Sequence, residues 1–147
     1  MRNARYQFWV ILGLIILGIL DTSYLTWEHY ANIIPPCPAH SVLGSFVDCG
    51  RVLRSQYATV FGIPLAVIGL GYYIFLLFVT YFKPKLLFFI TPFALLASVY
   101  FLYLQIFVLH TICLYCTLSG VINLLLFIFI WSPKLFLMLR QKSSLTK

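Results

Sequence analysis

Charged side chains are scarce in this chain. Only 9% of its 147 residues are Asp, Glu, Lys or Arg, whereas 63% are hydrophobic and the mean hydropathy is +1.01. So few polar residues cannot cover the surface of a water-soluble domain, and this composition excludes that class. The chain is therefore predicted to be an integral membrane protein.

Recognisable cofactor motifs are also lacking. The sequence contains no dinucleotide or flavin fingerprint. Its three histidines are peripheral to the apolar runs, which leaves no pair inside the membrane to hold haem. No small-x-small cleavage site follows the first apolar run, so a retained helix is favoured over a removed secretory signal. Redox chemistry here would have to rest on the cysteines and on an acceptor from outside the chain.

Four apolar runs have the length needed to cross a bilayer, about 20 residues each. They are Phe8–Trp27, Ile63–Phe82, Leu86–Leu109 and Cys113–Trp131. The connections 83–85 and 110–112 are very short, so the helices they join must be antiparallel neighbours. The sequence thus predicts a single domain over residues 1–147, an all-α bundle of four transmembrane helices. An outer loop at 28–59 is expected to carry a short surface helix around residues 51–57.

Acidic residues number only three, against ten basic ones, and the formal net charge is +7. In a four-span arrangement most of the basic residues fall on one side, namely Arg2, Arg5, Lys83, Lys85, Lys134, Arg140, Lys142 and Lys147. Because cytoplasmic loops are rich in Lys and Arg, both termini are predicted to be cytoplasmic. The charge is a topology signal and not a sign of nucleic-acid binding. All four cysteines then face the outer side of the cytoplasmic (inner) membrane, where disulfides persist.

A Cys-x-x-Cys motif, Cys113-Leu114-Tyr115-Cys116, lies where the third apolar run gives way to the fourth. Thiols three residues apart share one face of a helix's first turn and can form an easily exchanged disulfide. The free N–H groups and the dipole at a helix N-terminus favour a thiolate, the species that exchanges. A zinc half-site and two inert buried thiols are the alternatives.

The other two cysteines, Cys37 and Cys49, lie in the outer loop. Cys37 falls in the Pro-rich stretch Ile34–Pro38, which resists helix formation, and Gly44 and Gly50 are turn residues that could bring the two sulfurs together. A disulfide across this loop is consistent with the spacing. It could serve as a permanent staple, worth about 2–3 kcal/mol, or as one stage of an electron relay.

Such a relay would need a final acceptor. A disulfide at the outer edge of a membrane can take electrons from a reduced protein, but it must pass them on before it reacts again. A lipid-soluble quinone meets this requirement, a conclusion reached by elimination. Four small or polar residues of the fourth span could line an internal face, namely Thr117, Ser119, Gly120 and Asn123. Asp21 interrupts the first span, where it could face the bundle interior as a proton relay or lie in water near the outer boundary.

The order of several short motifs is more specific than any one of them. They are Asp48-Cys49-Gly50-Arg51-Val52-Leu53, Ser55, Tyr57-Ala58, Phe61-Gly62-Ile63-Pro64 and the Cys-x-x-Cys that opens the fourth span. This series resembles the vitamin K epoxide reductase family in its bacterial or archaeal single-domain form, over residues 24–131. The DsbB type of membrane disulfide generator differs, because it carries its Cys-x-x-Cys in the first outer loop.

The resemblance implies a quinone-dependent thiol oxidase that generates disulfide bonds. Cys116 would react with the quinone, ubiquinone or menaquinone, and Cys113 would be its resolving partner. Cys49 would exchange with Cys113, and Cys37 would meet a reduced thioredoxin-fold partner outside the membrane. Ser55 matches a serine near the quinone carbonyl, and Tyr57 and Phe61 could wall the quinone ring. No metal is implied.

Two departures from the vertebrate members of the family bear on the substrate. Those proteins have a Tyr four residues after the last Cys and an Asn in the second span, both of which contact the substrate. Here Gly120 takes the first position, and the second span has no Asn. Reduction of vitamin K or its epoxide is therefore the lesser alternative, as is a membrane subunit with static disulfides. The chain also ends without a thioredoxin-like domain, so the partner is expected to be a separate protein.

Overall fold

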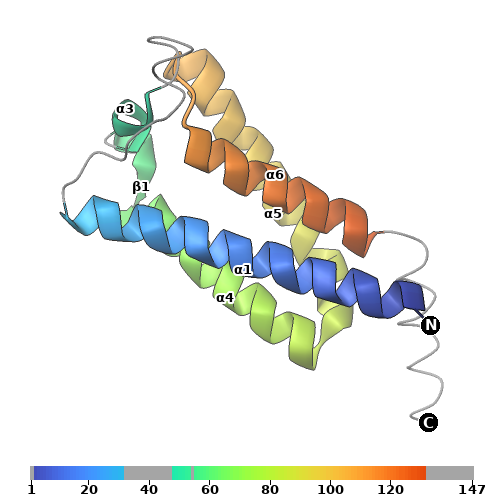
Figure 1. Ribbon diagram of the computed structural model, residues 1–147. Coiled ribbons are helices and arrows are strands. Elements are labelled where there is room, and N and C mark those ends of the chain that lie inside the picture. The colour runs from blue at the N-terminus through green and yellow to red at the C-terminus, as the bar shows by residue number, and fades with distance from the viewer. Residues whose placement is uncertain (1, 32–47, 54, 132–147) are drawn as a thin grey trace.

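The computed structural model describes residues 2–31, 48–53 and 55–131. Four long helices dominate it: α1 (Arg2–Ala31), α4 (Leu65–Phe82), α5 (Leu87–Tyr103) and α6 (Leu114–Ile130). Helix α1 packs against α4 and α6, and α5 packs against α6, so the helices form one bundle (Figure 1). The predicted number of long helices agrees with the structure.

The connecting elements gather at the two ends of the bundle. A 3-10 turn, Pro84–Leu86, joins α4 to α5 at the end where α1 begins and α6 finishes (Figure 1). At the opposite end lie the short helix α3 (Cys49–Leu53), a 3-10 turn (Gln56–Ala58) and the strands β1 (Thr59–Val60) and β2 (Ile63–Pro64). The strands pair antiparallel, with Val60 opposite Ile63.

Several expected boundaries need correction. Helix α1 continues through residue 31, so residues 28–31 are helical and do not belong to the outer loop. The surface helix begins at Cys49, earlier than expected, and a separate 3-10 turn follows it. The third span does not end as a regular α-helix but passes into a π-helix, Leu104–Val108. Hydrophobicity locates a span, but caps and local turns decide where its helix ends.

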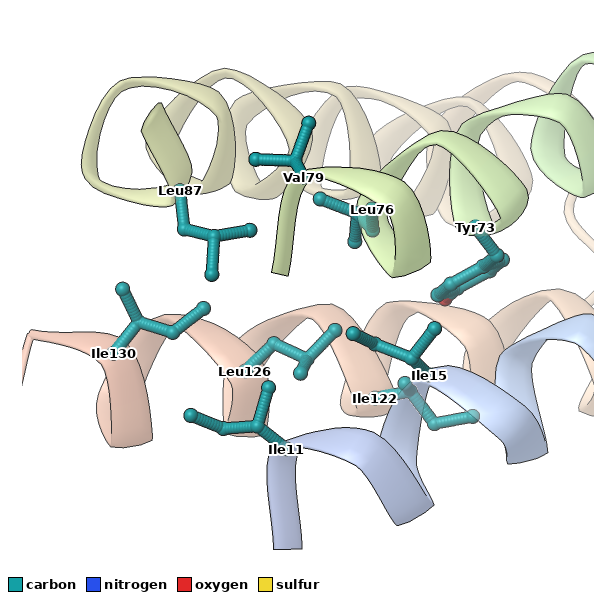
Figure 2. Close-up of a cluster of buried hydrophobic side chains, with 9 residues drawn as sticks. All are labelled: Ile11, Ile15, Tyr73, Leu76, Val79, Leu87, Ile122, Leu126 and Ile130. Carbon is teal, nitrogen blue, oxygen red and sulfur yellow. The ribbon is translucent and has the colours of Figure 1, made fainter. Parts of the chain in front are cut away.

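The core is a cluster of buried side chains drawn from all four long helices (Figure 2). Its members are Ile11, Ile15, Tyr73, Leu76, Val79, Leu87, Ile122, Leu126 and Ile130. Many other large apolar side chains point away from the bundle, such as Phe78, which is 60% exposed, and Leu96, which is 67% exposed. This outward-facing apolar surface is what a membrane protein presents to lipid.

Small residues let α1 and α4 approach closely. Gly18 lies directly against the ring of Tyr73, where any Cβ would overlap the ring. A Cβ at Gly69 would lie 3.1 Å from Cγ2 of Thr22, whereas Gly71 has open space beside it. Close helix contact through small residues is the usual packing solution in membranes. Of the two glycines of the second span, Gly69 contributes to that contact.

By length and composition, three helical segments can each cross a membrane: Tyr6–Ala31, Leu65–Phe82 and Pro84–Val108. The fourth, Leu114–Ile130, is also apolar but shorter. Pro84 begins the third segment, a position where proline costs no hydrogen bond because a first-turn N–H has no intrahelical acceptor. The end of the bundle that carries α3 also holds Cys49, Cys113 and Cys116.

Candidate active site

The Cys-x-x-Cys opens helix α6, as its spacing predicted. Cys113 is the residue that caps the helix, and its sulfur accepts a hydrogen bond of 3.5 Å from the backbone N–H of Cys116. The carbonyl oxygen of Cys113 accepts two more bonds, from the backbone N–H and the hydroxyl of Thr117. Both cysteines are free thiols in this structure. The helix start thus holds a dithiol, with Cys113 fully buried and Cys116 half-buried.

Gln105 fixes the backbone just before this motif. Its side-chain oxygen accepts a bond of 2.8 Å from the backbone N–H of Cys113, and its own carbonyl accepts one of 3.0 Å from Thr111. Gln105 lies inside the π-helix at the end of α5 and is 4% exposed. Single π-helical turns are often found at functional sites. The sequence did not assign Gln105 to the site, because no sequence pattern predicts a π-helix.

The loop cysteine Cys49 packs in the same buried cluster as Cys113. It begins α3, is completely buried and is disulfide-bonded. Cys49, Val52 and Cys113 belong to one buried cluster, against which Tyr115 and Cys116 pack. The expected fourth member of the relay, Cys37, lies outside the described residues. A bonded loop cysteine and a free helix pair therefore lie close together at the end of the bundle that carries α3.

A cavity of about 780 Å³ opens beside Cys116. Its walls come from all four long helices and from the segment that follows α3, and they are mostly apolar. Ser55 and Tyr57, which the sequence resemblance suggests as quinone contacts, line this cavity. The Ser55 hydroxyl donates a 2.8 Å bond to the carbonyl of Val52, which anchors this wall to α3. The four small or polar residues singled out in the fourth span, Thr117, Ser119, Gly120 and Asn123, also line it.

Phe61, in contrast, is not among the residues that line this cavity, and its side chain is 100% exposed. Phe61 and Gly62 form the two-residue turn between β1 and β2, with φ angles of 52° and 80°. Two left-handed residues are typical of the tight turn whose twist matches a β-hairpin. That turn projects the Phe61 ring from the tip of the hairpin, away from the cavity wall.

Polar groups inside the cavity form two hydrogen-bonded sets. The Tyr72 hydroxyl donates to Oδ1 of Asn123 over 3.2 Å, and Nδ2 of Asn123 donates to the Ser98 hydroxyl over 2.9 Å. The Tyr73 hydroxyl lies 2.9 Å from that of Ser119. These contacts join α4, α5 and α6 deeper in the bundle than Cys116. Sequence reasoning considered Asn123 but missed the two tyrosines, which looked like ordinary residues of an apolar run.

Two carboxyl groups lie on the face of α1 that turns inward. Asp21 is 9% exposed and Glu28 is 3% exposed, and within the described residues one oxygen of each has no hydrogen-bond partner. Asp21 interacts electrostatically with Tyr73, Cys113 and Cys116. Of the two placements left open for Asp21, the structure therefore selects the bundle interior. Among the residues described, no group of three or more His, Cys, Asp or Glu side chains could hold a metal ion.

The free thiol pair lies between a disulfide-bonded cysteine and an apolar cavity, inside a bundle of membrane-type helices. This arrangement is that of a membrane redox protein. The sequence model of the vitamin K epoxide reductase family matches residues 9–131, and the chain belongs to this family of oxidoreductases. Thiol-disulfide oxidoreductase LTO1 of Arabidopsis thaliana is 36% identical over an alignment 127 residues long. The match covers 74% of this chain and 32% of that protein. The chain thus spans about a third of the length of this curated relative.

Proposed function

We propose that this protein is a quinone-dependent thiol oxidase that generates disulfide bonds in a thioredoxin-fold carrier. One observation carries the proposal: Cys116 lines the cavity, while its neighbour Cys113 is packed against the disulfide-bonded Cys49. One thiol of the pair therefore faces a space of ligand size, and the other faces the loop cysteine. The name of the plant relative, a thiol-disulfide oxidoreductase, supports the same chemistry.

The proposed cycle begins at the loop. The two thiols of a reduced carrier exchange with the Cys37–Cys49 disulfide through a mixed disulfide, so a disulfide forms in the carrier and the loop pair is left as two thiols. The Cys49 thiolate then attacks Cys113 of an oxidised Cys113–Cys116 pair and releases Cys116 as a thiolate. Attack by Cys37 on Cys49 restores the loop disulfide and frees Cys113. At the end of this exchange Cys49 is expected to be disulfide-bonded, with Cys113 and Cys116 as free thiols. The structure has the same combination.

The second half of the cycle regenerates the helix pair. The two thiols lose two electrons and two protons, which pass to a quinone co-substrate and convert it to the quinol, and a Cys113–Cys116 disulfide forms. The cavity suits such a molecule because its volume and apolar walls, with a few polar groups, match those of small-molecule sites. Ser55 and Tyr57 are the proposed contacts carried over from the sequence, and ubiquinone and menaquinone are the candidate acceptors. Phe61 is left out because its ring points away.

The distribution of charge supports an outward-facing site. Lys83 and Lys85 lie in the α4–α5 connection, at the opposite end of the bundle from α3 and the Cys-x-x-Cys (Figure 1). If basic connections are cytoplasmic, the cysteines face outward and the termini face the cytoplasm of a bacterial inner membrane. A thioredoxin-fold carrier on that side would then reach the loop pair.

The test is a direct turnover assay. Purified protein would be mixed with a reduced thioredoxin-fold carrier and with ubiquinone or menaquinone, and quinone absorbance and carrier thiols would be followed together. We expect one quinone reduced for each carrier disulfide formed, and no reaction with Cys116→Ala. A rate of carrier oxidation that does not depend on the quinone would refute the proposal. Cysteine pairs that resist mild reductant would also refute it, because purely structural disulfides behave in that way.

A further inference from the structure

The cavity contains a polar network at some distance from the cysteines. Tyr72 of α4, Asn123 of α6 and Ser98 of α5 all line the cavity and are joined by hydrogen bonds of 3.2 and 2.9 Å. The Ser98 hydroxyl donates in turn to the backbone carbonyl of Ala94 over 2.9 Å. Three helices thus contribute one polar group each to a space that is otherwise largely apolar.

The network has hydrogen-bonding capacity to spare. An Asn side chain carries two N–H donors and an oxygen that accepts two bonds. Within the described part of the chain, one N–H of Asn123 is used by Ser98 and one acceptor position by Tyr72. Its second N–H and the acceptor lone pairs of the Tyr72 oxygen are left for a further partner. Because polar groups in apolar surroundings are costly unless paired, such capacity beside a cavity indicates a ligand.

The position of the network relative to Cys116 indicates which part of a ligand it meets. Asn123 is seven residues after Cys116, two turns along α6 on the same face, or about 10.5 Å along the helix axis. A quinone carries carbonyl oxygens at opposite ends of its ring. A ring in the cavity beside Cys116 would therefore point one oxygen towards the outer end of the bundle and the other towards Asn123.

We infer that the Tyr72–Asn123–Ser98 network binds the inner carbonyl oxygen of the quinone. Asn123 donates its second N–H to that oxygen, Ser98 holds the amide in place, and the Tyr72 oxygen accepts the hydrogen bond of the product quinol. Negative charge grows on the carbonyl oxygen as electrons arrive from the thiol pair, so a donor aimed at it favours reduction. This inference rests on the proposed quinone acceptor and specifies how this chain recognises it.

The experiment measures quinone binding directly. The dissociation constant of ubiquinone-1 would be determined for the detergent-purified protein and for Tyr72→Phe, Asn123→Leu, Ser98→Ala and Ser98→Thr. Asn123→Leu removes the hydrogen bond to the quinone, and Tyr72→Phe and Ser98→Ala each remove a bond that holds the Asn123 amide in place, so each change should weaken binding about fivefold. Ser98→Thr should bind normally because it keeps the hydroxyl. Tyr100→Phe is the matched control, since Tyr100 is 57% exposed and is not among the cavity residues.

Steady-state kinetics and stability separate binding from a merely structural role. The KM for ubiquinone-1 should rise in Asn123→Leu and Tyr72→Phe while the KM for the reduced carrier stays constant and the quinone-free variants stay folded. Equal dissociation constants in the parent protein, Asn123→Leu and Tyr72→Phe would show that the network only joins helices and would overturn the inference. A parent protein that neither binds nor reduces ubiquinone-1 and menadione would instead refute the proposed function itself.

Discussion

The backbone N–H of Cys113 donates a hydrogen bond of 2.8 Å to the side-chain oxygen of Gln105, eight residues earlier in the chain. This bond ties the start of α6 to the π-helical end of α5. Because Gln105 is buried and also lines the cavity, it positions the reactive pair from inside the bundle. It acts through Cys113 and is therefore a positioning residue.

Replacing Gln105 with Leu should disturb the thiol pair. The substitution leaves the N–H of Cys113 buried and unpaired, at a cost of about 1–3 kcal/mol. We expect slower turnover and a shifted reduction potential of the Cys113–Cys116 pair, measured by titration against glutathione. Gln105→Glu keeps an acceptor oxygen and should preserve the potential better. A Leu variant with the parent potential would mean that the bond is dispensable.

A visible absorption band should show which thiol, Cys113 or Cys116, contacts the quinone. Cys113→Ala removes the disulfide partner of Cys116 and leaves Cys116 at the helix N-terminus, where the dipole favours a thiolate. With ubiquinone bound, a thiolate against the electron-poor ring should give a visible charge-transfer absorption that fades as acid protonates the sulfur. Cys116→Ala should stay colourless. Colour that follows Cys113 instead would reverse the order of electron transfer.

The loop pair can be tested by trapping the carrier. In the proposed order Cys37 receives the carrier and Cys49 resolves the mixed disulfide. Cys49→Ala should therefore accumulate a covalent complex with the carrier that reductant releases, visible by non-reducing electrophoresis. Cys37→Ala serves as the control and should form no adduct. An adduct that appears only in the control would exchange the roles of the two cysteines.

Asp21 offers a test of proton transfer. Its carboxyl is buried, and within the described residues one of its oxygens has no hydrogen-bond partner; we predict that it accepts the proton that a thiol must release before it reacts. We expect Asp21→Asn to slow quinone reduction about 10²-fold, the usual size of a general-base contribution. Carrier trapping at the loop should continue at the parent rate. Asp21→Glu retains a carboxyl and should keep most of the activity; an active Asn variant would assign Asp21 a packing role only.

Topology can be checked with single cysteines placed at the two ends of the bundle. Phe61, at the tip of the hairpin, is fully exposed, and Lys85 is exposed in the α4–α5 connection. In a cysteine-free background, a membrane-impermeant thiol reagent should label Phe61→Cys in intact cells. It should reach Lys85→Cys only after the cells are permeabilised. The opposite pattern would invert the orientation drawn from the basic residues.

The amino-acid sequence by itself determined the four apolar helices, because 20-residue apolar runs with few charges have no other stable arrangement in a membrane. It also placed Cys113 and Cys116 at a helix start, since the motif follows the short connection 110–112. The order of the loop and helix motifs was enough to identify the family, which the match over residues 9–131 confirms. These properties depend on local pattern, and local pattern can be read from the chain.

Only the tertiary structure decided which residues meet. Tyr72 and Asn123 are 51 positions apart, and nothing in either apolar run indicated that their side chains share a hydrogen bond. The sequence could show that Gly120 replaces a tyrosine and that the second span lacks an asparagine. It could not show that a tyrosine from the second span and an asparagine from the fourth come together in the cavity.

The same limit applies to Phe61, Gln105 and Asp21. A positive φ at Phe61 turns its ring outward, and a π-helical turn brings Gln105 under Cys113. Neither backbone conformation follows from the residue types. The interior placement of Asp21 depends on which face of α1 packs against its neighbours, and in an apolar run that face has no marked periodicity. Side-chain direction in such a bundle is set by helix contacts, which exist only once the chain has folded.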